Sequence, residues 1–244
     1  APVVSISTLA IAVEIDTTGA VKVSLADGQS SADGSGVDVD GDTITITSGG
    51  NYILSGTLTD GHVVVDADDE DVVLTLSGVS ISCSDYAAIY VKKAESVTIN
   101  LEDGTQNTLA VTGEYVQSDD NNVDGAIFSK SDLTFTGAGT LTIDAEYGHG
   151  IVTKDNLVIA GGVYDITAES HGISGKDSVT ITGGTFDITC GEDGIHGSND
   201  EDDTLGWVTI TGGTITIAAG DDGVHAETAL TVSGGTIDIT ESYE

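Results

Sequence analysis

The chain has 244 residues, 41 of them acidic and six of them lysines, and a formal net charge of -35 at pH 7. This charge excludes nucleic acid as a partner, because a phosphate backbone attracts basic surfaces, and it disfavours an anionic membrane for the same reason. Cations are the expected partners, and a merely very soluble surface is the alternative interpretation. Thr, Ile, Val, Asp and 33 Gly dominate the composition, and no stretch has clean helical periodicity, which predicts an all-β fold.

Residues 1–33 do not fit the repeat that follows them. Val13-Glu14-Ile15 and Val21-Lys22-Val23 flank Thr17-Thr18-Gly19, which predicts a hairpin-like cap. A solenoid needs such a cap because an open end exposes the core and unpaired strand edges. The segment 1–33 is therefore assigned as an N-terminal cap or assembly segment.

The beginning of the chain also bears on its location. The start Ala1-Pro2-Val3-Val4 is typical of a mature terminus left by signal-peptide removal. No apolar run of about 18 residues is present, so no membrane insertion is expected. We expect a secreted protein, either extracellular or attached to the cell surface.

A short, regular repeat is clearest in the second half of the chain. Gly-Gly pairs recur at sequence intervals of 22, 29 and 22: Gly161-Gly162, Gly183-Gly184, Gly212-Gly213 and Gly234-Gly235. Glycines that precede a short apolar pair recur at intervals of 22, 22 and 29: Gly150, Gly172, Gly194 and Gly223. Both series place seven extra residues between Ile195 and Trp207. A fixed period of this size is typical of a solenoid.

Each repeat contains three short strands separated by turns. In the repeat that begins at His171, the strands are Gly172-Ile173-Ser174, Val179-Thr180-Ile181-Thr182 and Thr185-Phe186-Asp187-Ile188-Thr189. Strands this short are stable when successive coils stack about 4.8 Å apart and bury one continuous apolar column. Weaker repeats extend upstream, so residues 34–244 are predicted to form a single-stranded parallel β-helix of about eight coils. A two-sheet sandwich is the alternative.

The two cysteines occupy the same phase of the repeat. Cys83 follows Ile81-Ser82, and Cys190 follows Ile188-Thr189. Four coils separate them, roughly 19 Å at one strand spacing per coil, whereas a disulfide needs Cα atoms within about 7 Å. We expect two separate thiols that face the core.

Several motifs carry a resemblance to a known family. They are Ala126-Ile127-Phe128-Ser129-Lys130, His149-Gly150-Ile151, Gly175-Lys176-Asp177-Ser178-Val179, Asp193-Gly194-Ile195, Ser198-Asn199-Asp200-Glu201-Asp202, Gly220-Asp221-Asp222-Gly223-Val224-His225-Ala226-Glu227-Thr228 and Ser242-Tyr243-Glu244. With these motifs the chain resembles the secreted, clostridial-type cellulose- and pectin-binding β-helix family, which is related to family-9 pectate lyases. The resemblance covers residues 34–244. It implies a right-handed helix, secretion, calcium sites and polysaccharide binding.

Acidic residues recur at one corner of consecutive coils, in Glu192-Asp193-Gly194 and Asp221-Asp222-Gly223. Stacked carboxylates about 5 Å apart repel by roughly 3 kcal/mol at an effective dielectric constant of 20. Calcium offsets this repulsion and takes six to eight oxygen ligands. The predicted calcium ligands are Glu192, Asp193, Asn199, Asp200, Asp202, Asp221 and Asp222, with the loop that contains the seven extra residues closing the site. Solvated turn acids without a metal are the alternative.

A second set of residues is predicted to bind the polysaccharide. Lys130, Lys154 and Lys176 form a ladder at sequence intervals of 24 and 22, either as charge-paired turn residues or as a row of cations for uronate carboxylates. Tyr147 and Trp207 are candidate sugar-stacking side chains. His196 and His225 lie beside the acidic corner and complete the predicted ligand-binding set.

Catalysis is not the favoured function. The calcium motif of the family-9 lyases reads Asp-Asp-Gly, one apolar residue, then Asp. Here Asp221-Asp222-Gly223-Val224 matches it, but His225 replaces the last Asp. In addition, no Lys or Arg follows Lys176 to act as the base. A histidine can serve as a base in principle, so a calcium-dependent lyase stays an alternative. We expect a non-catalytic, extracellular, polysaccharide-binding β-helix with calcium sites. The other alternative is a filament or matrix subunit that stacks head to tail, because no cap follows the last coil at Thr240.

Overall fold

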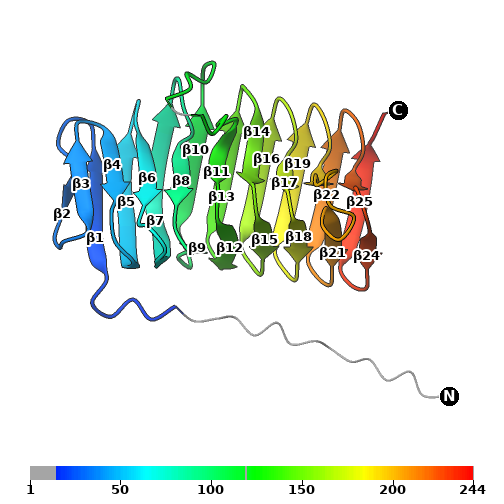
Figure 1. The fold of residues 1–244 in the computed structure, drawn as a ribbon, viewed down its shortest axis with the longest axis horizontal. Helices are drawn as coiled ribbons and strands as arrows, with labels where there is room; N and C mark the ends of the chain where they lie inside the picture. The colour runs from blue at the N-terminus through cyan, green and yellow to red at the C-terminus, as the bar shows by residue number, and fades with distance from the viewer. Residues whose placement is uncertain (1–14, 119, 244) are drawn as a thin grey trace.

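The computed structural model describes residues 15–118 and 120–243, which form one stack of parallel β-coils (Figure 1). Each regular coil has three strands, and strands of successive coils pair in parallel into three ladders. The described residues contain no helix that is long and apolar enough to cross a membrane. The all-β, solenoid architecture predicted from the repeat is confirmed, whereas the right-handedness and the number of coils stay predictions.

The three ladders are numbered in the order in which the chain passes through them within one coil. The first ladder contains β3 (Val37–Asp40), β4 (Thr43–Ile46), β6 (His62–Asp66), β8 (Ile89–Lys93), β11 (Gly125–Ser129), β14 (His149–Thr153), β17 (Ile173–Gly175), β20 (Ile195–Gly197) and β23 (Val224–Ala226). The second contains β9 (Ser96–Leu101), β12 (Asp132–Gly137), β15 (Asn156–Ile159), β18 (Ser178–Ile181), β21 (Trp207–Ile210) and β24 (Leu230–Val232). The third contains β10 (Gln106–Val111), β13 (Thr140–Ala145), β16 (Val163–Ala168), β19 (Thr185–Cys190), β22 (Thr214–Ala219) and β25 (Thr236–Glu241). Long strands β5 (Gly50–Leu58) and β7 (Asp71–Cys83) join the second and third ladders.

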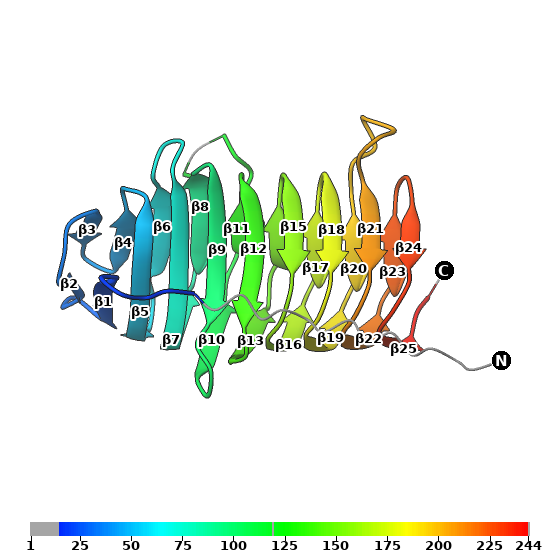
Figure 2. The same ribbon diagram turned by 90° about the horizontal axis from the view of Figure 1, so that it is seen from below.

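Strand register follows the sequence repeat. In the first ladder, Ile151 pairs with Ile173, Ile173 with Ile195, and Ile195 with Val224. The paired residues are 22 positions apart in the first two pairs and 29 positions apart in the third. The seven extra residues lie between β20 and β21, as the glycine spacing predicts. The resulting loop leaves the solenoid beside β21 in Figure 2.

The core is a set of apolar columns that run along the solenoid axis. Ile166, Ile188 and Ile217 occupy equivalent positions in the third ladder and are fully buried. An aromatic column accompanies them: the ring centroids of Phe135 and Tyr164 lie 6.0 Å apart, and those of Tyr164 and Phe186 lie 4.8 Å apart in a stacked arrangement. Side chains stacked along the axis, such as Phe186 on Tyr164, therefore take the place of the interdigitating side chains of an ordinary two-layer core.

The Gly-Gly turns need glycine at both positions for different reasons. A Cβ on Gly183 would lie 2.6 Å from the carbonyl oxygen of Ala160 in the preceding coil, which is too close for a side chain. Gly184 has a φ of 103°, in the region that L-residues rarely adopt. The other three pairs repeat this division of roles, and this requirement gives the sequence its clearest repeat signal.

A second apolar cluster lies outside the core, on the outer face of the first ladder. It contains Cys83, Tyr86, Ala87, Tyr90, Val123, Phe128 and Val152. The segment between β10 and β11 covers this face: Ser118 Oγ bonds to the Tyr86 hydroxyl at 3.0 Å, and Asn121 Nδ2 donates to the Tyr90 hydroxyl at 2.6 Å. Phe128 is fully buried in this cluster, apart from the axial column.

The N-terminal end contains antiparallel pairs, although their partners differ from those expected. β1 (Val21–Ala26) pairs antiparallel with β2 (Ser31–Ala32), and β3 pairs antiparallel with β4. β1 also pairs in parallel with β5, which joins this end to the solenoid by hydrogen bonds. Of the other predicted hairpin strand, Val13 and Glu14 lie outside the described residues. Ile15, which is described, is not in a strand.

Both cysteines are free and buried, as the repeat predicts. The register connects them through Val111, Ala145 and Ala168, which is four steps along the third ladder. Desolvation raises the pKa of both thiols. Cys83 differs from Cys190 in packing against the outer cluster.

Replacing Ile188 with Ala tests the axial column. Because Ile188 is fully buried between equivalent isoleucines, the truncation should lower the free energy of unfolding by about 2–5 kcal/mol through lost burial and an unfilled cavity. Urea denaturation measures the change. The matched control is Asp187→Asn, on the exposed face of the same strand, which should change stability by no more than about 0.5 kcal/mol. Equal losses in the two variants would contradict the assignment of the core.

Candidate functional site

Four lysines occupy equivalent positions at the corner between the first and second ladders. Val91 pairs with Ser129, Ser129 with Thr153, and Thr153 with Gly175, so the residues that follow form one column. That column contains Lys92, Lys130, Lys154 and Lys176. The sequence prediction found the last three and missed Lys92. The shared pattern Ala-Ile-aromatic-x-Lys, at residues 88–92 and 126–130, is the signal that could have found it.

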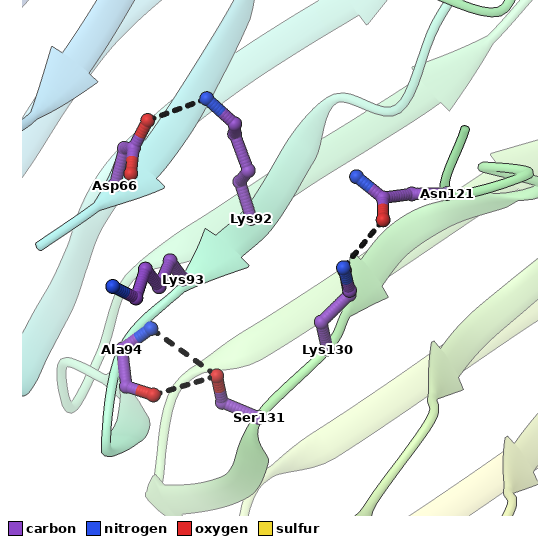
Figure 3. A pocket seen from close by; sticks show the side chains of 7 residues that line it. All are labelled: Asp66, Lys92, Lys93, Ala94, Asn121, Lys130 and Ser131. Atoms are coloured by element: carbon purple, nitrogen blue, oxygen red, sulfur yellow. Dashed lines mark hydrogen bonds and ion pairs between the residues drawn. The ribbon is translucent and has the colours of Figure 1, made fainter. Parts of the chain in front are cut away.

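A cavity of about 470 Å³ lies at the first two coils of this column (Figure 3). Its lining is Asp66, Lys92, Lys93, Ala94, Asn121, Lys130 and Ser131. Three of the six lysines of the chain therefore gather around one hollow, together with a single aspartate. In a chain of net charge -35, this is a local cationic site.

Polar partners hold the lysines of the cavity in place. Lys92 Nζ lies 2.6 Å from Asp66 Oδ2, and Lys93 Nζ lies 2.9 Å from Asp68 Oδ1. Lys130 Nζ donates to Asn121 Oδ1, so the segment over the outer cluster also closes one side of the cavity. The Lys92 and Lys93 side chains are half exposed, so their ammonium groups can exchange these contacts for a ligand's.

The other two lysines of the column have different surroundings. Lys154 Nζ lies 5.1 Å from the centroid of the Phe128 ring, a cation–π contact. Lys176 Nζ lies 2.9 Å from Glu201 Oε2, in the loop between β20 and β21, and this contact raises the pKa of Lys176. The predicted row of cations is therefore present as a column, but only its first half lines the cavity.

A column of aspartates runs beside the lysines. It contains Asp155 and Asp177, which are equivalent in successive coils, and Asp132, which is in register with Asn156 one residue further on. Burial and then repulsion by the other two carboxylates raise the pKa of Asp155 to about 6. Three like charges thus lie close together here and are not relieved by the neighbouring lysines, contrary to the simple charge-paired interpretation.

Four histidines and several acids form a second polar cluster, on the outer face of the first ladder. The ring centroids of His149 and His171 lie 5.0 Å apart, those of His171 and His196 lie 4.3 Å apart, and those of His196 and His225 lie 5.1 Å apart. Desolvation lowers the pKa of His149 to about 3 and also lowers that of His171 and His196. His225 differs, because its contact with Asp222 raises its pKa.

The corner acids stack in the register that the repeat predicts. Asp193 is buried, and its Oδ1 accepts a hydrogen bond from the backbone nitrogen of Asp222 at 2.9 Å. Asp193 Oδ2 lies 3.4 Å from His171 Nδ1, and Glu192 Oε2 lies 3.1 Å from His171 Nε2. These acids thus lie among histidines, and Asp221 is not part of any group of side chains close enough to share an ion in the described residues.

The loop residues of the predicted calcium set lie elsewhere. Asn199, Asp200 and Asp202 follow β20, whereas Asp193 precedes it, so the strand separates the two groups. A cavity of about 220 Å³ lies at the loop, lined by Asn199, Asp200, Asp202, Asp203, Glu227 and Thr228. The structure therefore divides the predicted ligands between a histidine-rich corner and an oxygen-lined loop.

The predicted stacking aromatics are not close to the lysine cavity. Tyr147 is half-buried, and its carbonyl oxygen accepts a hydrogen bond from the Tyr115 hydroxyl at 3.4 Å. Trp207 begins β21, pairs with Ser178 and is half-buried on the outer side of the second ladder. Neither residue lines the cavity of Lys92 and Lys130.

The fold and the lysine cavity together define a parallel β-helix with a lysine-lined hollow on its surface. A family model described as a carbohydrate-binding domain-containing protein matches residues 40–244, and the chain belongs to this family. A carbohydrate-binding domain-containing protein of Acetivibrio thermocellus is 40% identical over 136 residues, which are 54% of this chain and 48% of that protein. The chain thus matches about half the length of this curated relative.

A solved structure extends the similarity over nearly the whole fold. The polysaccharide lyase-like protein from C. thermocellum, in its gadolinium derivative, superposes with a TM-score of 0.79 at 37% identity. The match covers 91% of this chain and 95% of that chain. The resemblance drawn from the sequence motifs is thereby confirmed at the level of the carbohydrate-binding β-helix family.

Replacing Asp155 with Asn tests the repulsion in the aspartate column. The raised pKa means that the unfolded chain releases this proton first, so folded stability falls as pH rises from about 4 to about 6 and stays lower above that. Asp155→Asn should therefore raise the free energy of unfolding by about 1 kcal/mol at pH 7.5, a figure reduced for solvent screening. Near pH 4 the substitution should leave the free energy of unfolding unchanged. Urea denaturation in chelator measures both values. A gain that is equal at the two pH values, or equal to that of Asp187→Asn, would refute the interpretation.

Proposed function

We propose that the chain is an extracellular, non-catalytic module that binds acidic, pectin-like polysaccharide, with calcium as its ion. The lysine cavity is the observation that carries this proposal. Half of the lysines of a strongly acidic chain surround it. An ammonium group is a compact point charge, which suits a uronate carboxylate more than a neutral hydroxyl.

Membership of the carbohydrate-binding family supports the substrate class. The related solved structure is titled a polysaccharide lyase-like protein, and the lyase alternative therefore needs its own argument. The carboxylates beside the lysine column, Asp132, Asp155 and Asp177, belong to none of the groups of side chains close enough to share an ion in the described residues. Binding without bond cleavage is the simpler function for such a column.

Electrostatics also explains why a cation belongs to the proposal. A polyanionic saccharide approaches a protein of net charge -35, so the two repel each other beyond the cavity. A divalent cation held by the protein reduces this repulsion. The loop cavity fits such an ion, because all six of its lining residues carry a side-chain oxygen and calcium prefers oxygen ligands.

The filament alternative has a more limited basis. Leu230 and Val232, in β24, are about half exposed, so a further layer of strands could cover them. Of the proposed N-terminal assembly segment, residues 1–14 lie outside the described residues, whereas residues 15–33 contain β1 and β2. Electron microscopy of the native preparation, with and without calcium, tests head-to-tail stacking directly.

Removing two cavity lysines should weaken binding to polygalacturonate. The double variant Lys93→Gln/Lys130→Gln should bind about tenfold more weakly, because it loses charge-assisted contacts worth about 1.4 kcal/mol together. Affinity electrophoresis through polygalacturonate gels measures the change, and the difference should shrink at high salt. Lys22→Gln, on β1 far from the cavity, is the matched control and should bind normally.

Two outcomes would contradict this proposal. Equal retardation of the double variant and the Lys22→Gln control would remove the cavity from the binding site. Absorbance of an unsaturated product, when the protein is incubated with polygalacturonate and calcium, would show that the chain is a lyase. The same gels cast with a neutral cellulose derivative measure how far binding depends on ligand charge.

Calcium should stabilise the chelator-treated protein. Adding calcium should raise the melting temperature by several degrees, because an ion that binds only the folded state stabilises it. The double variant Asp200→Asn/Asp203→Asn should lose most of this rise, since both residues line the loop cavity. Asp187→Asn is again the control and should keep it. Absence of both calorimetric heat and a melting shift would refute the calcium site.

A further inference from the structure

The outer column of the first ladder changes character along the solenoid. Its pairing continues from Tyr90 through Phe128 and Val152 to Ser174, then to His196 and His225. The first three of these side chains are buried beneath the segment between β10 and β11. His196 and His225 lie beyond that cover, so the same position supplies partly exposed imidazoles in two consecutive coils.

Glu227 completes a set of three donors with these histidines. His196, His225 and Glu227 each offer one atom, and the three atoms lie within 4.8 Å of one another. His225 Nε2 lies 3.5 Å from Glu227 Oε1. The side chains are 16%, 36% and 36% exposed, so an ion can reach them from solvent.

A carboxylate outside the set orients one of the rings. Asp222 Oδ2 lies 3.1 Å from His225 Nδ1 and accepts its N–H. The lone pair of Nε2 then faces the Glu227 carboxylate, and two such acceptors next to each other require a proton or a metal ion between them. A carboxylate on the second ring nitrogen is the usual support for a metal-bound histidine.

His196 can present a lone pair in the same way. His171 Nε2–H donates to His196 Nδ1 at 3.2 Å, and Glu192 Oε2 lies 3.1 Å from the same nitrogen as a second possible acceptor. When His171 donates to Glu192, His196 is free to carry its own proton on Nδ1, 3.8 Å from Asp193 Oδ2. Its Nε2 is then a metal-binding atom.

The other end of the histidine column is less suited to a metal. His149 Nδ1 accepts the backbone N–H of His171 at 3.1 Å, and His171 Nδ1 accepts that of Asp193 at 3.0 Å. Each neutral ring therefore carries its proton on Nε2, the atom that would have to bind the ion. These two histidines serve as hydrogen-bond acceptors between coils, although they and Glu192 also lie close together.

We propose that His196, His225 and Glu227 form a binding site for a divalent transition-metal ion of the zinc type, oriented by Asp222. Two imidazoles and one carboxylate match the preference of zinc, cobalt and nickel, whereas calcium prefers more numerous oxygen ligands. Three protein donors leave one position of a tetrahedral ion for water or a ligand oxygen. This site is separate from the proposed calcium function, although Glu227 also borders the loop cavity.

Zinc titration of the tag-free, chelator-treated chain in excess calcium tests the proposal. Calorimetry should show one saturable site, and cobalt in place of zinc should give the visible absorption of a tetrahedral centre. His225→Gln and Glu227→Gln should each weaken zinc binding at least about tenfold. His149→Asn is the matched control, because His149 belongs only to the histidine group that the hydrogen bonds disfavour, and the zinc affinity of this variant should be unchanged.

Several outcomes would overturn the site. They are the absence of saturable binding, many weak equivalents that calcium displaces, and a loss with His149→Asn in place of Glu227→Gln. Circular dichroism and melting without metal establish that each variant is folded. Glu227 is partly exposed, so Glu227→Gln keeps the test valid even if His225→Gln destabilises the chain.

Discussion

Hydrogen bonding between successive coils in one fixed register is the constraint on which the rest of the structure depends. Each short strand is paired on both sides by equivalent strands, so no coil can shift without moving every side chain out of its column. The register therefore stacks like residues on like. For isoleucine and aromatic rings this stacking is favourable, and it places Ile188 on Ile166 and Phe186 on Tyr164 in the axial core.

The same register creates electrostatic costs that an ordinary fold would avoid. Asp155 and Asp177 are held one above the other with Asp132 close by, and these carboxylates add to burial in raising the pKa of Asp155. Lysines are stacked in the neighbouring column, and each takes a different partner: Asp66, Asn121, the Phe128 ring or Glu201. Columns of like charge are also what a periodic, charged polymer can contact repeatedly. Under the proposed function, the lysine column is the surface that a charged saccharide chain would contact.

Two irregular segments give this regular surface its individual sites. The segment between β10 and β11 covers the outer aromatic cluster and supplies Asn121 to the lysine cavity. The loop between β20 and β21 supplies the oxygen-lined cavity and Glu201. Both segments border the outer face of the first ladder. Between and beyond them, this face exposes the histidines, whose hydrogen bonds differ at the two ends of their column.

The sequence by itself determined the solenoid. The Gly-Gly spacing follows from close approach of one coil to the next and from a positive φ, both of which are local requirements that only glycine meets. It also determined the position of the seven-residue insertion, the separate buried cysteines and the stacking of the corner acids. Only the tertiary structure decided which stacked residues share a site. The lysine cavity depends on Asn121 crossing the outer face, and Phe128 is buried by that same crossing. The predicted calcium ligands are divided because the strand β20 lies between Asp193 and the loop. The number of residues between Asp193 and the loop does not by itself show this separation in space.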